Sequence, residues 1–207
     1  MMSRGLQRGM KDEFQRFLST DRGIWSWSTP KKDFGTHWGR LELRGLAKKT
    51  YPVHQQTQTI SLIFDKDFRH QDPTVHPRFE QFKDSLSPAL QKVADYFNQM
   101  PIAQEQKATH GEGFFVRLII VKLQNEGIVH PHGDAGFSLM HSHRIHMPVF
   151  VDGEVLFKIG PECRTLQAGT IWEINNKCLH AVKIYQGNLE STWLPTGWFR
   201  VSGVAAA

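Results

Sequence analysis

The second half of the chain consists of short apolar segments separated by turn residues, and this pattern constrains the fold more than any other feature. Between Arg144 and Val151, apolar side chains occupy every second position, as on a strand with one buried face. Asp152-Gly153 is a two-residue hairpin signal. The segments expected to be extended are 114–123, 127–134, 144–151, 154–159, 170–174 and 179–185. Short strands at this spacing predict a sandwich or barrel.

The first half predicts helices and one clear strand. Ser87-Pro88 can start a helix, because Ser is a capping residue and Pro suits the first helical position, and apolar residues then recur at helical spacing. Other expected elements are helices over 10–18 and 77–84, a strand over 58–64, strand or ordered loop over 24–27 and 38–43, and a loop over 101–113. We therefore expect a single domain over 1–207, with a helical and strand region over 1–110, a β core over 111–186 and a divergent tail over 187–207.

Charge and composition exclude several classes of protein. The net charge of +5 comes from Lys and Arg residues that are spread along the chain, whereas nucleic-acid modules concentrate them on one face. No apolar run is long enough for a transmembrane helix, and the N-terminus lacks a secretory signal, so a cytoplasmic protein is expected. Two cysteines, Cys163 and Cys178, are too few for a disulfide scaffold and are expected to be reduced.

Histidines cluster between His130 and His146, and this cluster carries the main chemical signal. His132 and Asp134 are two residues apart, so on an extended strand their side chains point the same way. His180, at the start of a later alternating segment, is the natural third ligand. Two imidazoles and one carboxylate leave open positions on a metal, which is the arrangement of non-haem Fe(II) oxygenases. A structural zinc site would prefer cysteine or a closed set of four ligands, and a calcium site would not use imidazole.

Arg144 and His146 lie on the parity of their segment opposite to the apolar residues. In a pocket, the planar guanidinium of Arg144 would suit a carboxylate. The same pattern also fits an arginine and a histidine that face solvent on a half-buried strand.

These residues resemble the aspartyl/asparaginyl β-hydroxylase family and the related proline hydroxylases, over roughly 114–182. The matching motifs, in order, are Gly127-Ile128-Val129-His130-Pro131-His132-Gly133-Asp134, Arg144-Ile145-His146-Met147-Pro148-Val149, Gly169-Thr170-Ile171-Trp172-Glu173-Ile174-Asn175-Asn176 and His180-Ala181-Val182. A fainter similarity covers Trp38 to Arg44.

The resemblance implies a mainly β fold, a double-stranded β-helix (a cupin-like jelly roll) with helices packed outside, mostly from the N-terminal half. It implies an enzyme that uses Fe(II), 2-oxoglutarate and O₂ to hydroxylate a peptidyl Asp or Asn, or a free amino acid such as proline. On this analogy His132, Asp134 and His180 bind iron, and His146 and Arg144 meet carboxylates of co-substrate or substrate. Residues expected around the pocket, near substrate or the metal ligands, are Arg117, Trp172, Asn175 and Asn176.

One departure from the family pattern affects the co-substrate. The family usually has an Arg about ten residues after the second metal histidine, which anchors the distal carboxylate of 2-oxoglutarate, and 187–193 contains none. Either Arg200 or Lys183 substitutes for it, or activity is reduced or lost. The alternatives are therefore a catalytically impaired, cupin-like binding paralogue, or a metal-dependent dioxygenase that does not use 2-oxoglutarate. The substrate and the oligomeric state are not predicted.

Overall fold

The computed structural model describes residues 24–27, 57–65, 72–123, 127–134, 136–151, 153–185 and 192–200. The helices are the 3₁₀ turn η3 (Pro77–Gln81), α2 (Lys83–Asn98), α3 (Pro101–His110) and α4 (Phe137–Met140). The strands of the first half are β1 (Ile24–Trp27), β2 (Thr57–Phe64) and β3 (Thr74–Val75). The strands of the second half are β4 (Phe114–Leu123), β5 (Ile128–His132), β6 (His143–His146), β7 (Glu154–Ile159), β8 (Glu162–Thr165), β9 (Ile171–Ile174), β10 (His180–Tyr185) and β11 (Thr192–Arg200).

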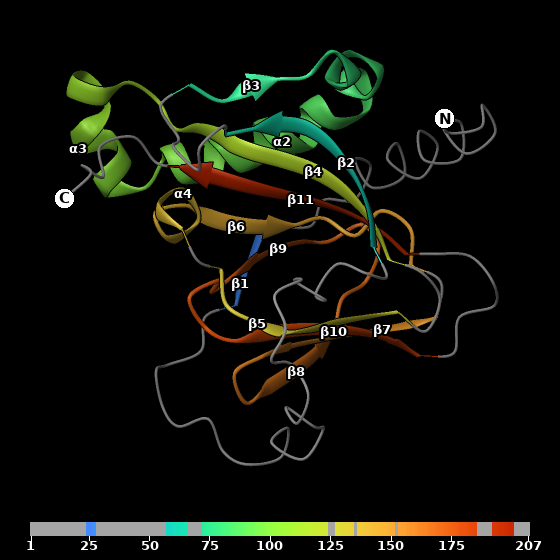
Figure 1. Ribbon diagram of the computed structural model, residues 1–207. Coiled ribbons are helices and arrows are strands. Elements are labelled where there is room, and N and C mark those ends of the chain that lie inside the picture. Colours follow the sequence, from blue (N-terminus) through green and yellow to red (C-terminus); the bar gives the residue numbers. More distant parts are fainter. Residues whose placement is uncertain are drawn as a thin grey trace.

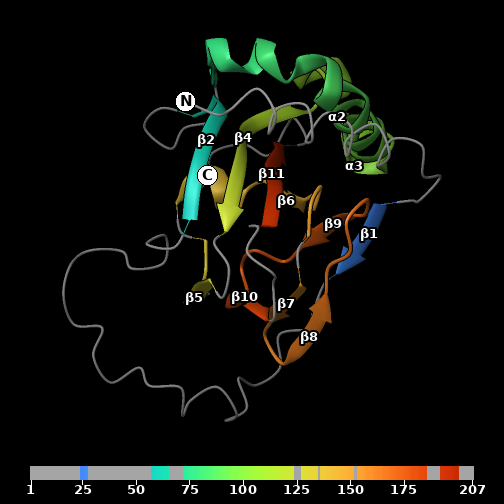
Figure 2. The ribbon, with the colours of Figure 1, turned by 90° about the vertical axis from the view of Figure 1, so that its right-hand side faces the viewer.

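Two β-sheets form the body of the protein, as the sequence predicts. The larger has seven strands in the order β1-β9-β6-β11-β4-β2-β3, and the smaller has four in the order β5-β10-β7-β8. All pairs are antiparallel except β1 with β9. The sheets lie face to face, with α2 and α3 on the side of the larger sheet away from the smaller one (Figures 1 and 2). The fold is therefore mainly β, a jelly roll with helices packed outside.

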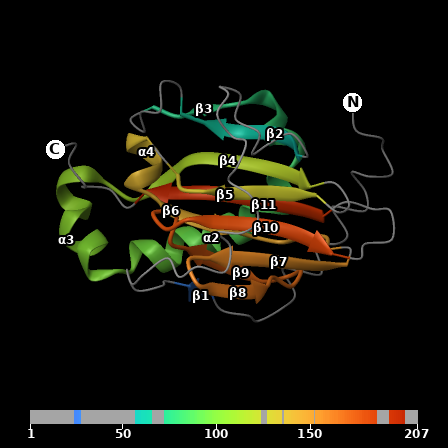
Figure 3. The same cartoon turned by 60° about the horizontal axis from the view of Figure 1, so that its bottom comes forward.

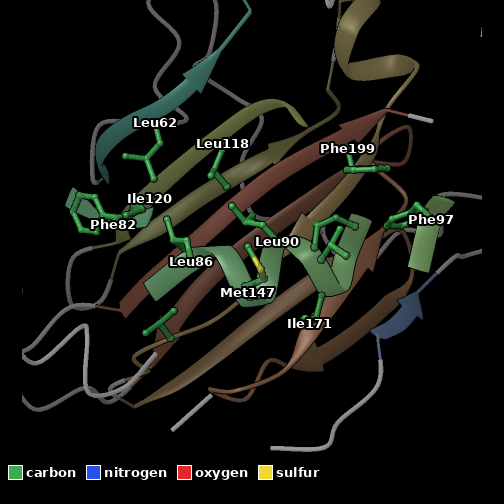
Figure 4. Packing of buried hydrophobic residues seen from close by; sticks show 14 of the residues in the cluster. Leu62, Phe82, Leu86, Leu90, Phe97, Leu118, Ile120, Met147, Ile171 and Phe199 are labelled. Carbon is green, nitrogen blue, oxygen red and sulfur yellow. The ribbon is translucent and has the colours of Figure 1, made fainter. Parts of the chain in front are cut away.

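The outer core lies between α2 and the larger sheet (Figure 4). Helix α2 presents Leu86, Leu90, Val93 and Phe97 at intervals of three and four residues, and all four are buried. They pack against Leu118 and other apolar residues of the sheet. Burying one such side chain contributes about 1.5–3 kcal/mol, so this interface fixes the outer face of the larger sheet.

The inner core lies between the two sheets, which Figure 3 shows with the smaller sheet in front. It contains apolar residues of β7, β9 and β10, including Phe157, Ile174, Val182 and Ile184. The alternation of strands places Val182 and Ile184 on the same face of β10 as His180. The interior beyond His180 is therefore apolar on this strand.

The last strand, β11, occupies the middle of the larger sheet, between β4 and β6. It falls within 187–207, where we expected a divergent tail, so the β core extends beyond residue 186. Its sequence hides it, because Pro195 and Gly197 interrupt the apolar pattern. Gly197 lies close to the ring of Phe115, and an added Cβ would be 2.9 Å from it. The glycine thus permits the β11–β4 approach.

Several other elements differ from the sequence prediction. The expected loop over 101–113 is wrong, because Pro101–His110 is helix α3, and only Ala103 of it is buried, so it has no apolar period to detect. Helix α2 starts at Lys83, and Pro88 lies inside it. Strand β6 ends at His146, before Pro148, rather than at Val151, and β8 was not expected. The expected elements over 10–18 and 38–43 lie outside the described residues.

Among the described residues, no helix has the length and apolar character needed to cross a lipid bilayer.

Candidate metal centre

The three predicted ligands meet between neighbouring strands of the smaller sheet. His132 ends β5 and His180 starts β10, and the two residues are direct partners in the antiparallel register. Their ring centroids are 4.3 Å apart. Asp134 follows β5 after one residue, and one ligand atom from each of the three residues lies within 4.8 Å of the others. The group is thus compact enough to hold one ion.

Both imidazoles are oriented so that Nε2 is the coordinating atom. Nδ1 of His132 is 2.8 Å from the carbonyl oxygen of His130, and Nδ1 of His180 is 3.0 Å from that of Cys178. Since a carbonyl only accepts, each Nδ1 carries the proton and donates it. Each Nε2 then keeps its lone pair, and such backbone partners are typical of histidines that bind metals.

Asn176 connects the segment that carries Asp134 to helix α4. Its carbonyl oxygen accepts the backbone N–H of Asp134 at 3.1 Å. Its side-chain Nδ2 donates to the carbonyl oxygen of Leu139 at 2.6 Å. Asn175 makes a local contact only, because its Oδ1 accepts the N–H of Lys177 at 3.1 Å. Of the two predicted asparagines, Asn176 is the one that positions a ligand.

Arg144 reaches the three-residue group from β6 of the opposite sheet. Its Nη1 lies 2.9 Å from Oδ1 and 2.8 Å from Oδ2 of Asp134. The same nitrogen is 2.5 Å from Nε2 of His180. Burial lowers the pKa of the guanidinium, and the carboxylate of Asp134 raises it. Burial, followed by the charge of Arg144, lowers the pKa of His180 to about 3, so its imidazole is neutral at neutral pH.

His146 lies two residues beyond Arg144, on the same face of β6. It is 2% exposed, and its ring contacts that of Phe157 in the other sheet, with centroids 5.1 Å apart. Its Nδ1 is 3.1 Å from Oγ1 of Thr196, its partner on β11. Its Nε2 is buried and has no hydrogen-bond partner among the described residues. Burial and then the charge of Arg144 hold the pKa of this imidazole well below 6.5.

A buried ion pair occupies the same face of the larger sheet. The register pairs Thr196 with Ile119, so Arg117, two residues from Ile119, also faces the smaller sheet. Its Nε donates to Oδ1 of Asp65 at 2.8 Å, and its guanidinium lies 4.5 Å from the centre of the Phe64 ring. Asp65 is fully buried. Sequence reasoning missed Asp65, which lies 52 residues from Arg117 and outside any motif.

The remaining predicted residues divide between this face and the outside. Trp172 is the partner of His146 on β9, and its Nε1 donates to Oγ1 of Thr170 at 2.7 Å. Arg200 is half-buried at the end of β11 and shares the parity of Thr196. Lys183 alternates with the inward residues of β10, and its Nζ lies 4.3 Å from the centre of the Tyr185 ring. The structure therefore does not bring Lys183 to the three candidate metal ligands.

The donor set fits a divalent transition metal. Two imidazoles, each with its Nδ1 held by a backbone carbonyl, and one carboxylate match the donor set of the facial triad that non-haem Fe(II) proteins use. A closed structural zinc site would need a fourth ligand, and the described residues add no further His, Cys, Asp or Glu to this group.

No family model matches the chain, and no curated protein matches it. Among solved structures, it is similar to an oxidoreductase of the 2OG-Fe(II) oxygenase family from Burkholderia pseudomallei, with 15% identity and a TM-score of 0.48. That match covers 70% of this chain and 66% of the other, just under two thirds of its length. The viral collagen prolyl hydroxylase of Paramecium bursaria Chlorella virus-1 has 11% identity and a TM-score of 0.45, over 72% of this chain and 81% of that one. A cupin 2 conserved barrel domain protein from Salinispora arenicola has 12% identity and a TM-score of 0.31, over 42% and 73%. With TM-scores below 0.5, these similarities leave the assignment of function to the side chains of the site.

Proposed function

We propose that the chain is an Fe(II)- and 2-oxoglutarate-dependent dioxygenase that hydroxylates an amino-acid residue or a free amino acid. The observation that carries this proposal is the convergence of His132, Asp134 and His180, with both Nε2 atoms directed away from their backbone partners. Bound there, Fe(II) would supply O₂ activation coupled to the oxidative decarboxylation of 2-oxoglutarate to succinate and CO₂. The narrower placement among aspartyl/asparaginyl β-hydroxylases rests on the sequence motifs.

The protein's own part in this reaction is to position ligands and exclude water. If the Thr196 hydroxyl donates to Nδ1, the imidazole of His146 carries its proton on Nε2, which is buried near the proposed metal ligands. That N–H can donate to an oxygen of the co-substrate. The apolar residues around Phe157 exclude water from this region.

A specific observation supports a second candidate, a metal-dependent dioxygenase that does not use 2-oxoglutarate. A distal carboxylate extending past His180 along β10 would meet Val182 and Ile184, and Lys183 points the other way. An unpaired carboxylate buried among such side chains is strongly unfavourable. Measuring 2-oxoglutarate affinity on the Mn(II)-loaded protein separates the two candidates, because only the first requires binding.

The main test is metal binding together with succinate release from 2-oxoglutarate in the presence of Fe(II). We expect His132→Ala to abolish both. His141→Ala is the matched control, because Nδ1 of His141 contacts the carbonyl oxygen of Phe137 in α4, the helix that ends just before it. Equal metal binding by wild type and His132→Ala would refute the ligand assignment.

A further inference from the structure

The geometry points to Arg144 as an internal cation that competes with the metal for its ligands. We propose that metal loading displaces the guanidinium and makes it available to an anionic ligand, so that metal and carboxylate binding are coupled through this side chain. The inference rests on the proposed function, which makes His132, Asp134 and His180 the metal ligands. It adds that the metal must displace Arg144 in order to bind.

The position of a single nitrogen carries the argument. Nη1 of Arg144 lies 2.8 and 2.9 Å from the two oxygens of Asp134 and 2.5 Å from Nε2 of His180. A divalent metal binds such oxygen and nitrogen donors at about 2.0–2.2 Å, which places it in the same small volume. Two cations so close repel each other strongly in a buried site. The guanidinium and the metal therefore exclude each other.

An arginine that only orients a ligand would make a different contact. A positioning partner bonds the carboxylate oxygen, or the ring nitrogen, that faces away from the ion. Nδ1 of His180 is held in this way by the carbonyl oxygen of Cys178. Arg144 instead contacts Nε2 of the same ring and both oxygens of Asp134. It covers the coordinating atoms rather than supporting them.

Displacement leaves Arg144 on an inner face that already carries a second cation. The strand β11 separates Arg144 from Arg117, and both register with Trp198. The charge of Arg117 is close enough to act on Arg144. Of the two carboxylates paired with these arginines, Asp134 would then ligate the metal, and Asp65 would remain with Arg117. The local excess of positive charge favours a carboxylate ligand.

Metal titration of the full-length protein with Mn(II), followed by calorimetry, tests the competition. Since a charge-assisted hydrogen bond is worth about 1.5–3 kcal/mol, Arg144→Gln is expected to tighten Mn(II) binding by about 10- to 100-fold. Arg164→Gln is the matched control, because it removes the same charge from an exposed pair with Glu162, and we expect unchanged affinity. Arg144→Lys keeps the charge and should bind Mn(II) less tightly than Arg144→Gln.

A measurement on the wild-type side chain keeps the proposal testable if Arg144→Gln does not fold. Nitrogen NMR of arginine side chains, with the Arg144 signal assigned from Arg144→Lys, should show a shift when diamagnetic Zn(II) is added. An Arg144 signal that does not move at saturating Zn(II) would overturn the proposal, as would equal or weaker Mn(II) binding by a folded Arg144→Gln.

The outcomes separate this inference from the proposed function. Tighter Mn(II) binding by Arg144→Gln without succinate release in any Fe(II)-loaded form supports the competition and counts against the oxygenase. Mn(II) binding that is lost in His132→Ala but unchanged in Arg144→Gln keeps the metal site and removes the competition. If neither wild type nor Arg144→Gln binds a metal, both fail.

Discussion

Replacing Asn176 by Asp tests whether this side chain ties α4 to the segment that carries Asp134. The change keeps the shape but exchanges the N–H donor for an oxygen. In Asn176 the amide nitrogen makes the contact, donating to Leu139 at 2.6 Å, so the contact is lost. In Asn175 the amide oxygen makes the contact, accepting from Lys177, so Asn175→Asp retains it. Two neighbouring changes of equal shape and charge should therefore have unequal effects.

The burial of Asn176 determines how much Asn176→Asp should lower the free energy of unfolding. The residue is 4% exposed, so an ionised carboxylate there would be desolvated, with one oxygen facing the carbonyl oxygen of Leu139. The lost bond and the desolvated charge together cost at least about 2 kcal/mol. The variant can avoid this only by taking up a proton, which lets the acid donate to Leu139. Keeping a group of pKa about 3.9 protonated at about pH 7.5 costs about 5 kcal/mol, which is the upper limit.

Urea unfolding of wild type and both variants at about pH 7.5 and about pH 5 measures the difference. The pKa of the new carboxyl is raised in the folded state, so the penalty relative to wild type shrinks as the pH falls. At about pH 5 it cannot exceed about 1.5 kcal/mol. Asn175→Asp should stay within about 0.5 kcal/mol of wild type. If both variants lose the same stability at both pH values, the role assigned to the Asn176 amide is wrong.

Three further changes test other parts of the fold by urea unfolding. Gly113→Ala should cost about 1–3 kcal/mol, because its Cβ would lie 2.6 Å from a carbonyl oxygen of β11, whereas the Cβ of Gly133→Ala meets nothing within 4 Å, and equal losses would contradict this. The imidazole of His146 stays neutral in the folded protein but takes up a proton in the unfolded chain as the pH falls. Between about pH 7.5 and 5.5, this group should therefore lower the free energy of unfolding of wild type by about 1.4 kcal/mol. His146→Gln should remove this part of the pH dependence. If the free energy of unfolding still changes with pH as in wild type, the His146 imidazole is not held neutral in the folded protein. Arg117→Met should lower the free energy of unfolding by about 3–5 kcal/mol, because it leaves Asp65 buried without its cation. Adding Asp65→Leu should recover part of this loss. An Arg117→Met variant as stable as wild type would contradict the prediction.

The candidate metal ligands could be predicted from sequence because the alternation of each strand sets the direction of its own side chains. The spacing of His132 and Asp134 fixes their relative direction, and the alternation of β10 places His180 on an inward position. The antiparallel pairing of β5 with β10 then brings them together, although β6 to β9 lie between these two strands in the chain. Where a contact follows from one strand and its neighbour, the sequence pattern is informative.

The contacts that could not be predicted join the two sheets or distant segments. Arg144 approaches Asp134 from the opposite sheet, and no period in the sequence specifies which residues face each other across a sandwich. Sequence alone left Arg144 between a pocket and a solvent-facing position. Strand β11 was missed for a related reason, since a strand inside a sheet is held by its two neighbours and tolerates a weak pattern of its own.

The division of the inner face into an apolar part and a charged part also bears on how a dicarboxylate would bind. Beyond His180, β10 presents Val182 and Ile184, where an ionised carboxylate would lose its water and gain no partner. On the larger sheet, Arg144 and Arg117 flank β11, and the fold already removes most of the water from both side chains. Since the desolvation of these cations is part of the folded state, a carboxylate binding beside them gains their attraction without that cost. We therefore expect both carboxylates of a dicarboxylate ligand to lie toward the larger sheet rather than along β10.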